Sequence, residues 1–167
     1  MPWEVRQILL MVHILLAIIW VGGVLFVGWG VFPAARTLTY KVQREFFHAL
    51  MKWTHWLFTL AGTGVIATGT LLGTVGGPIK TWDDIWQTTY GHIWATAFIV
   101  ATFTLLWGIT FGYKQSMKVF SEEERWIWKL AANGDKHPLN QSMLKIVVIE
   151  GVEAIGFIIL IALMVML

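Results

Sequence analysis

The 167-residue sequence contains no cysteine and few charged side chains, which make up 13% of its residues. The absence of cysteine excludes disulfides and thiolate metal sites. A soluble domain carries about a quarter of its residues as Asp, Glu, Lys and Arg, so this chain has too little polar surface for one. With 57% hydrophobic residues, the composition indicates an integral membrane protein.

Long apolar runs are the main feature that is present. Four of them, at about 8–32, 53–79, 91–113 and 144–167, reach the roughly 20 residues that a helix needs to cross the bilayer. We expect a single all-α domain over residues 1–167, a four-helix bundle with up-down-up-down topology in a lipid bilayer. Pro33 is expected to end the first helix. Ser121 and the three glutamates after it predict a short amphipathic helix at about 122–132, lying in the membrane interface.

The basic residues are unevenly distributed between the loops. Arg6 and Lys80 belong to one side of the predicted bundle, whereas the other side holds the rest: Arg36, Lys41, Arg44, Lys52, Lys114, Lys118, Arg125, Lys129, Lys136 and Lys145. The positive-inside rule predicts a multi-pass protein of the cell (inner) membrane with both termini outside and the basic loops in the cytoplasm. The net charge of +2 therefore reflects topology, and no nucleic-acid partner is predicted.

Two histidines lie near the outer ends of their predicted spans. Helices one and three run in the same direction, which places His13 and His92 at about 10 and 15 Å from the membrane midplane. Two imidazoles that meet inside a bundle are the axial ligands that haem b needs. The alternative is that each imidazole hydrogen-bonds a carbonyl or lies among the lipid headgroups.

A second group of ionisable residues is predicted nearer the cytoplasmic side. Glu150 and Glu153 are one turn apart on one face of the fourth helix, and His55 lies in the second span. A bare carboxylate at this depth costs several kcal/mol, so each should be protonated, hydrogen-bonded or paired. His55, Glu150 and Glu153 predict either a proton-handling or metal site, or a structural network between helices two and four.

The second helix also carries a stripe of histidines and glycines. Its members are seven residues apart, a spacing that keeps side chains on one face of a helix: His48, His55, Gly62, Gly69 and Gly76. Such a stripe predicts close helix packing. It would also admit the edge of a flat macrocycle.

Three short motifs resemble the CopD copper-resistance family: H-I-x-x-x-I-x-W-x-G-G-x-x-F from His13 to Phe26, TGTLLG in the second span and QTTYGHIW before the third. The same plan resembles the HemJ-type protoporphyrinogen oxidases, four-span proteins with histidines in spans one and three and an acidic residue in span four. The HemJ resemblance implies haem b, with His13 and His92 matching the family histidines and Glu150 or Glu153 matching the acid. The HemJ pattern has a lysine two residues after the span-three histidine, and this chain has Trp94 there. This difference counts against the porphyrinogen reaction but not against haem binding.

These observations predict a membrane-embedded redox protein that holds haem b through His13 and His92, with electron transfer or haem-dependent oxidation as its function. His55 is a further cofactor-binding candidate, and Glu150 and Glu153 are expected to handle protons. The alternatives are a CopD-like copper protein, in which His13 and His92 bind copper with Met11 as a soft ligand, and a non-catalytic subunit of a larger respiratory or photosynthetic complex. Other membrane or electron-transfer subunits, or further copies of the chain, are expected partners. If the chain is an enzyme, it is an oxidoreductase.

Overall fold

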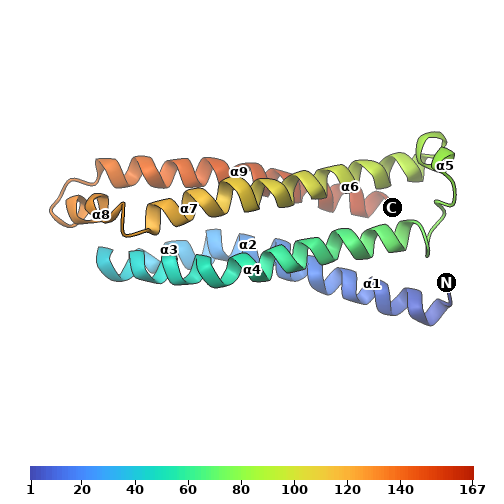
Figure 1. Ribbon diagram of the computed structural model, residues 1–167, viewed down its shortest axis with the longest axis horizontal. Coiled ribbons are helices and arrows are strands. Elements are labelled where there is room, and N and C mark those ends of the chain that lie inside the picture. The colour runs from blue at the N-terminus through green and yellow to red at the C-terminus, as the bar shows by residue number, and fades with distance from the viewer.

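The computed structural model describes residues 1–167 and is an antiparallel four-helix bundle without strands (Figure 1). All four predicted spans are present as helices that are long and apolar enough to cross a membrane, at Trp3–Ala35, Tyr40–Gly73, Thr89–Phe120 and His137–Met166. Both termini lie at one end of the bundle. The predicted fold class, an all-α membrane bundle, is therefore confirmed.

The first long helix changes its winding along its length. It consists of α1 (Trp3–Ala17), η1 (Ile18–Gly22), α2 (Gly23–Phe26), η2 (Val27–Val31) and α3 (Phe32–Ala35), where η denotes a π-helical turn. The prediction that Pro33 ends this helix is wrong, because the helix continues to Ala35. Proline lacks a backbone N–H, and its ring crowds the helical turn that precedes it. The turn that precedes Pro33 is η2, a π-helical turn that is wider than an α-helical one.

The other three long helices are α4 (Tyr40–Gly73), the continuous helix formed by α6 (Thr89–Trp107), η3 (Gly108–Gly112) and α7 (Tyr113–Phe120), and α9 (His137–Met166). Each begins or ends with polar turns outside the apolar run from which it was predicted. The second span was expected to reach residue 79, but α4 ends at Gly73 and residues 74–81 form the following loop.

Two short helices close the ends of the bundle. The helix α5 (Trp82–Gln87), which the sequence interpretation missed, begins with a capping box formed by Thr81 and Asp84. The helix α8 (Arg125–Ala132) corresponds to the predicted helix at 122–132, but Ser121 is not its cap, because the hydroxyl of Ser121 donates to the Lys118 carbonyl. Ile127, Trp128 and Ala131 of α8 are buried against the bundle. The helix is thus amphipathic as predicted: these three residues pack on the bundle, while Trp126 on its other side is 54% exposed.

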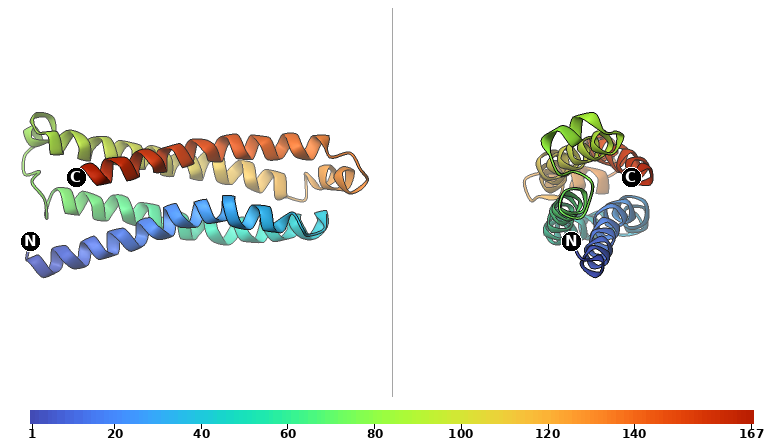
Figure 2. Two further views of the ribbon diagram at one scale, coloured as in Figure 1. Left: turned by 180° about the vertical axis from the view of Figure 1, so that it is seen from behind. Right: turned by 90° about the vertical axis from the view of Figure 1, so that its right-hand side faces the viewer.

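The long helices pack as two pairs, which meet where α4 lies beside α6 and α7 and around Trp20. The helix α1 runs along α4, α6 runs along α9, and α4 lies beside α6 (Figure 2). One buried cluster surrounds Trp20, whose ring meets that of Phe157 edge-on at 5.2 Å between centroids. The second cluster lies between α4, α7, α8 and α9 and includes Phe47, Phe120 and Trp128.

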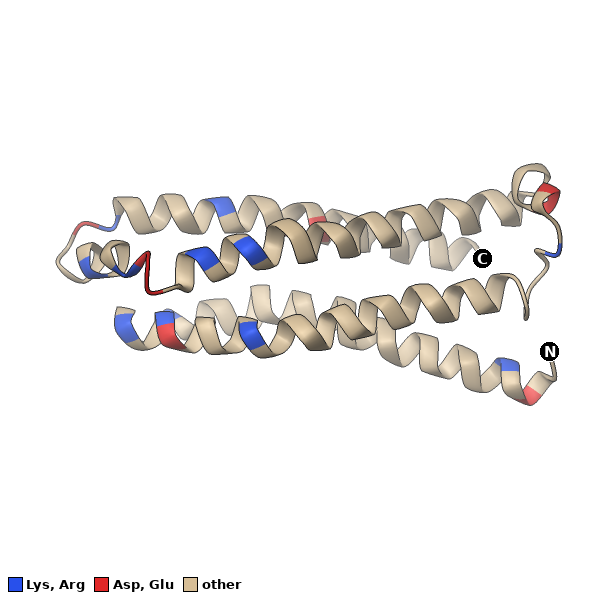
Figure 3. Ribbon diagram, in the orientation of Figure 1, with Lys and Arg blue, Asp and Glu red and all other residues tan.

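The charges of the chain gather at the end of the bundle that holds α8 (Figure 3). We call this end, formed by residues 36–39, α8 and the adjoining helix turns, the basic end. Inside it Arg44 is buried at 4% exposure, and its guanidinium donates to the Ser121 carbonyl at 3.1 Å and to the Glu122 carboxylate at 2.6 Å. Arg44 thus caps the C-terminal end of α7, where carbonyl groups have no helical partner.

Candidate functional site

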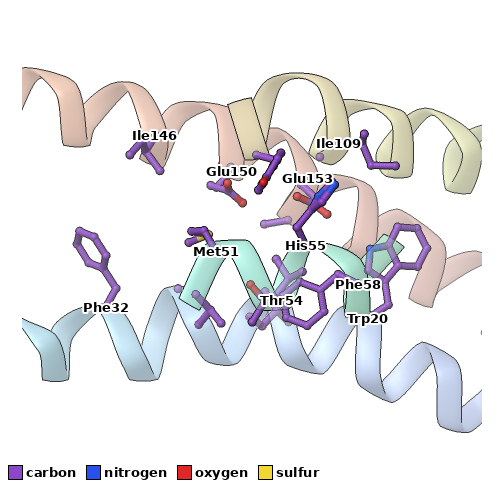
Figure 4. A pocket seen from close by; sticks show the side chains of 18 of the residues that line it. Trp20, Phe32, Met51, Thr54, His55, Phe58, Ile109, Ile146, Glu150 and Glu153 are labelled. Atoms are coloured by element: carbon purple, nitrogen blue, oxygen red, sulfur yellow. The ribbon is translucent and has the colours of Figure 1, made fainter. Parts of the chain in front are cut away.

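A cavity of about 310 Å³ lies in the middle of the bundle, where all four long helices contribute to its wall. Sites for small molecules and cofactors are commonly of this size and mostly apolar. Apolar side chains form 14 of its 22 lining residues, and the ionisable residues among the others are His55, Glu150 and Glu153. The structure thus brings the three predicted inner residues to one site (Figure 4).

His55 reaches this cavity from α4. Its imidazole stacks on the phenol ring of Tyr113, with 3.7 Å between ring centroids and 13° between ring planes. Tyr113 comes from the first turn of α7, so the stacking joins the second and third long helices beside the cavity.

Glu150 and Glu153 enter the same cavity from α9, and each lies over a glycine of η3. A Cβ atom added to Gly108 would lie 2.9 Å from both carboxylate oxygens of Glu153, and one added to Gly112 would lie 3.1 Å from Oε1 of Glu150. The spacing of three residues on α9 is matched by a spacing of four on η3, so both carboxyl groups fit against one face. Glu153 is the more deeply enclosed, at 6% exposure, and the indole of Trp20 lies beside it.

All three π-helical turns of the chain border this cavity. Trp20 in η1, Gly28 in η2 and Gly108 in η3 are lining residues. A π-helical turn inserts one residue into a helix, which rotates the side chains that follow it, and such turns are frequent at functional sites. Their grouping at one cavity indicates that this region is shaped for more than helix packing.

The acidic residues of the cavity have no basic partner. Both ion pairs in the chain involve Glu122 at the basic end, and no Lys or Arg lines the cavity. No three His, Asp and Glu side chains are arranged to hold a metal ion together. The geometry therefore favours a site that handles protons or binds a cationic group over a three-ligand metal centre.

His13 faces α4 rather than α6. Its Nδ1 lies 2.8 Å from the hydroxyl oxygen of Thr68, and that hydroxyl already donates to the Gly64 carbonyl at 2.7 Å. Since a hydroxyl has one proton to donate, Nδ1 of His13 is the donor to Thr68. When the imidazole is neutral, its lone pair is on Nε2, the arrangement found in histidines that bind metals.

His92 is bound elsewhere. Its side chain is exposed, and its Nε2 lies 2.8 Å from the carbonyl of Trp86 in α5. Since a carbonyl only accepts, Nε2 is protonated and cannot ligate a metal in this arrangement. Each predicted axial ligand thus makes its hydrogen bond to a different helix. Met11, the predicted soft ligand for copper, is 56% exposed on the outside of the bundle.

The glycine stripe of α4 is filled by side chains of this chain. Glycine leaves room at Gly62 for Trp20 and Leu105 and at Gly69 for His13, and Gly73, one turn further along α4, leaves room for Trp94. The indole N–H of Trp94 also donates to the Gly69 carbonyl at 3.3 Å. The packing interpretation of this stripe is therefore confirmed. With the groove occupied and His92 turned away, these residues do not fit a haem held by both His13 and His92.

Several residues of the cavity were missed by the sequence interpretation. Trp20 and Tyr113 were not predicted to be site residues. Gly108 and Gly112 form a small-xxx-small pair in GITFG, a spacing that indicates close helix contact and that matches the two acids of α9. The matching spacings of these two glycines and of Glu150 and Glu153 are the sequence feature from which the contact could have been predicted.

Comparison of the chain with protein-family models, with curated proteins and with solved structures finds no match. Its function is therefore argued from the site itself.

Proposed function

We propose that this chain is a membrane-embedded binding protein that takes a small molecule with an apolar surface into the mid-bundle cavity and releases a proton as the molecule binds. One observation carries this proposal: His55, Glu150 and Glu153 line a single cavity inside otherwise apolar spans. Ionisable residues within a membrane are functional candidates because they are costly to keep there. Glu153 is the principal proton carrier in this proposal, because it is the most enclosed acid and has no basic partner.

The chemistry follows from the cost of burying charge. An unpaired carboxylate in an apolar site is strongly disfavoured, so Glu153 holds a proton while the cavity has no cation. A ligand that brings a compensating charge or a strong hydrogen-bond donor removes that penalty and allows the proton to leave. Glu150, His55 and Tyr113 also line the cavity. They provide the polar groups along which the proton leaves.

Infrared spectroscopy of the protein in lipid nanodiscs tests this proposal. We expect a protonated carboxyl band that disappears as pH is raised and that is missing from Glu153→Gln. Glu123→Gln, which changes an exposed acid in the loop before α8, is the matched control and should retain the band. If wild type and Glu153→Gln have the same carboxyl bands at every pH, the proposal is wrong.

Haem b with a redox function is the second candidate, with His13 as its only ligand from this pair, because His92 is turned away. The hydrogen bond from Nδ1 of His13 to Thr68 leaves Nε2 as the nitrogen that could serve as an axial ligand when the imidazole is neutral. Under this proposal, a reduced-minus-oxidised visible spectrum has a b-type band that His13→Ala removes. His137→Ala, an exposed histidine at the start of α9, should leave the band unchanged. A colourless protein that contains copper would favour the copper alternative, and one without metal would exclude both.

The orientation predicted from the basic residues belongs to the same proposal: the basic end faces the cytoplasm of a cell whose inner membrane holds the protein. Because the chain has no cysteine, single cysteines provide labelling sites without background. Lys136→Cys at the basic end should be labelled by a membrane-impermeant maleimide only after the cells are opened. Asp83→Cys at the opposite end should be labelled in intact cells, and the reverse pattern would overturn the orientation.

A further inference from the structure

The wall of the cavity is open on one side, between η2 and α9. Gly28 of η2 and Gly151 of α9 both line the cavity, and a Cβ atom added to either would meet nothing within 4 Å. Two neighbouring lining residues reach the outer surface of the bundle, since Trp29 is 79% exposed and Val147 is 57% exposed. Because all four long helices are apolar enough to cross a membrane, an opening halfway along the bundle would lead into the bilayer rather than into water.

The interior of the cavity combines unpaired acids with aromatic walls. Glu153, 6% exposed and without a basic partner, projects into it together with Glu150 (Figure 4). Aromatic residues from three of the long helices line the same cavity, namely Trp20, Phe32, Phe58 and Tyr113. Aromatic faces attract cations, and the attraction is stronger where water is excluded. The site therefore suits a molecule with a positive charge and an apolar surface.

We propose that the ligand is an apolar organic cation that enters from the bilayer between Gly28 and Gly151 and displaces the proton of Glu153. This inference rests on the proton-exchanging function proposed above and adds the class of ligand and its route. The exchange conserves charge: a monovalent cation binds, the carboxyl group of Glu153 becomes a carboxylate paired with it, and one proton is released to water. Glu150 and His55, the other ionisable groups that line the cavity, undergo no net change in this exchange.

The pH dependence of binding follows from this exchange. While Glu153 is protonated in the free protein, each cation that binds releases one proton, so the dissociation constant should fall about tenfold for each unit by which pH is raised. A cation that merely adsorbs to lipid or to the surface of the bundle would release no proton from the protein.

Titration calorimetry with tetraphenylphosphonium, using the protein in nanodiscs, measures both quantities. This probe has no proton of its own, so protons counted by comparing buffers of different ionisation enthalpy come from the protein. We expect one proton per cation bound, and a loss of affinity of at least about tenfold in Glu153→Gln. Equal binding by wild type and Glu153→Gln, or binding without proton release, would overturn the inference. Empty nanodiscs correct for adsorption to lipid.

The route is tested by narrowing the opening. Gly28→Leu and Gly151→Leu add a side chain where nothing stands, and each should slow association about tenfold when binding is followed by stopped flow, the reduction that a barrier of about 1.4 kcal/mol produces. Gly22→Leu is the matched control, because Gly22 is an exposed glycine of the same long helix that does not line the cavity. Equal rates in all three variants would overturn entry between η2 and α9.

The infrared experiment separates the two proposals. If the Glu153 carboxyl band titrates in wild type but tetraphenylphosphonium does not bind, the cation inference is wrong and the proton-exchanging function stands. If the band itself is absent, both are wrong. Gly28→Leu and Gly151→Leu should retain the band, which shows that these variants are folded.

Discussion

Glu153 of α9 lies directly over Gly108 of η3, with no space for a side chain between them. An added Cβ atom would be 2.9 Å from both carboxylate oxygens and 3.0 Å from the carboxyl carbon. Glycine at this position thus makes room for the acid on the facing helix and is not needed for the backbone conformation, since Gly108 has no positive φ. This relationship holds the carboxyl group at the wall of the cavity and makes its position sensitive to a single methyl group.

Gly108→Ala should therefore displace the carboxyl group of Glu153. The atoms that the added methyl group would meet are the end of a flexible side chain, so the carboxyl group moves away from η3 into the cavity at little cost in stability. The infrared carboxyl band should shift. Gly151→Ala is the matched control, because its added methyl group would meet nothing. An unshifted band in Gly108→Ala, or the same shift in both variants, would contradict the close contact.

Thr68→Val should weaken the contact between α1 and α4. The Thr68 hydroxyl accepts from Nδ1 of His13 at 2.8 Å, and hydrogen bonds between membrane helices contribute about 0.6 kcal/mol on average. The expected loss of stability is of that order, with Nδ1 of His13 left without its partner. Nitrogen NMR of the imidazole should then show a mixture of tautomers in place of one.

Thr70→Val tests whether this effect is specific. Thr70 lies two residues further along α4, and its hydroxyl donates to the Ile66 carbonyl of its own helix. It has no contact with His13 to lose, so the stability and the imidazole spectrum should remain those of the wild type. A change in the His13 tautomer in Thr70→Val would contradict the assignment of Thr68 as its partner.

The fold was largely predictable because hydrophobic length alone identifies helices that span a membrane. The residues at which those helices begin and end were harder to predict. The helix α9 begins at His137, seven residues before the predicted run, because a helix continues beyond the hydrocarbon wherever its first turns find partners in the protein. The π-helical turns leave no simple pattern in the sequence, since they depend on how each long helix packs on its neighbours.

The candidate site was predictable only in part, for a geometric reason. Glu150, Glu153 and His55 stand out because ionisable residues are rare in apolar runs, and their depth could be calculated from the helical rise. Depth does not determine the direction in which a side chain points. His13 and His92 lie at similar predicted depths, yet one bonds to α4 and the other to α5. Rotation of each helix about its axis decides such contacts.

Arg44→Met should destabilise the basic end of the bundle. Methionine preserves much of the side-chain length but leaves the Ser121 carbonyl without its donor, and an unsatisfied buried group costs about 1–3 kcal/mol. Hydrogen exchange should rise first in α7 and α8, which meet at this carbonyl, while amides around Trp20 stay protected. Lys41→Met, which removes an exposed charge one turn earlier, is the control and should leave exchange unchanged.

The Arg44–Glu122 pair also predicts how stability depends on pH. Hydrogen bonding from the Arg44 guanidinium lowers the pKa of Glu122 below its ordinary value. A carboxyl group whose pKa is lower in the folded state stabilises the fold above its ordinary pKa, and this contribution is lost as pH falls through the lowered value. Thermal midpoints of wild type and Glu122→Gln should therefore differ at neutral pH and converge in acid. The difference should stay small because Glu122 is exposed. Glu123→Gln, which changes the next residue but breaks no bond to Arg44, should follow the wild-type curve, and a gap that persists in acid would exclude the ion pair as its cause.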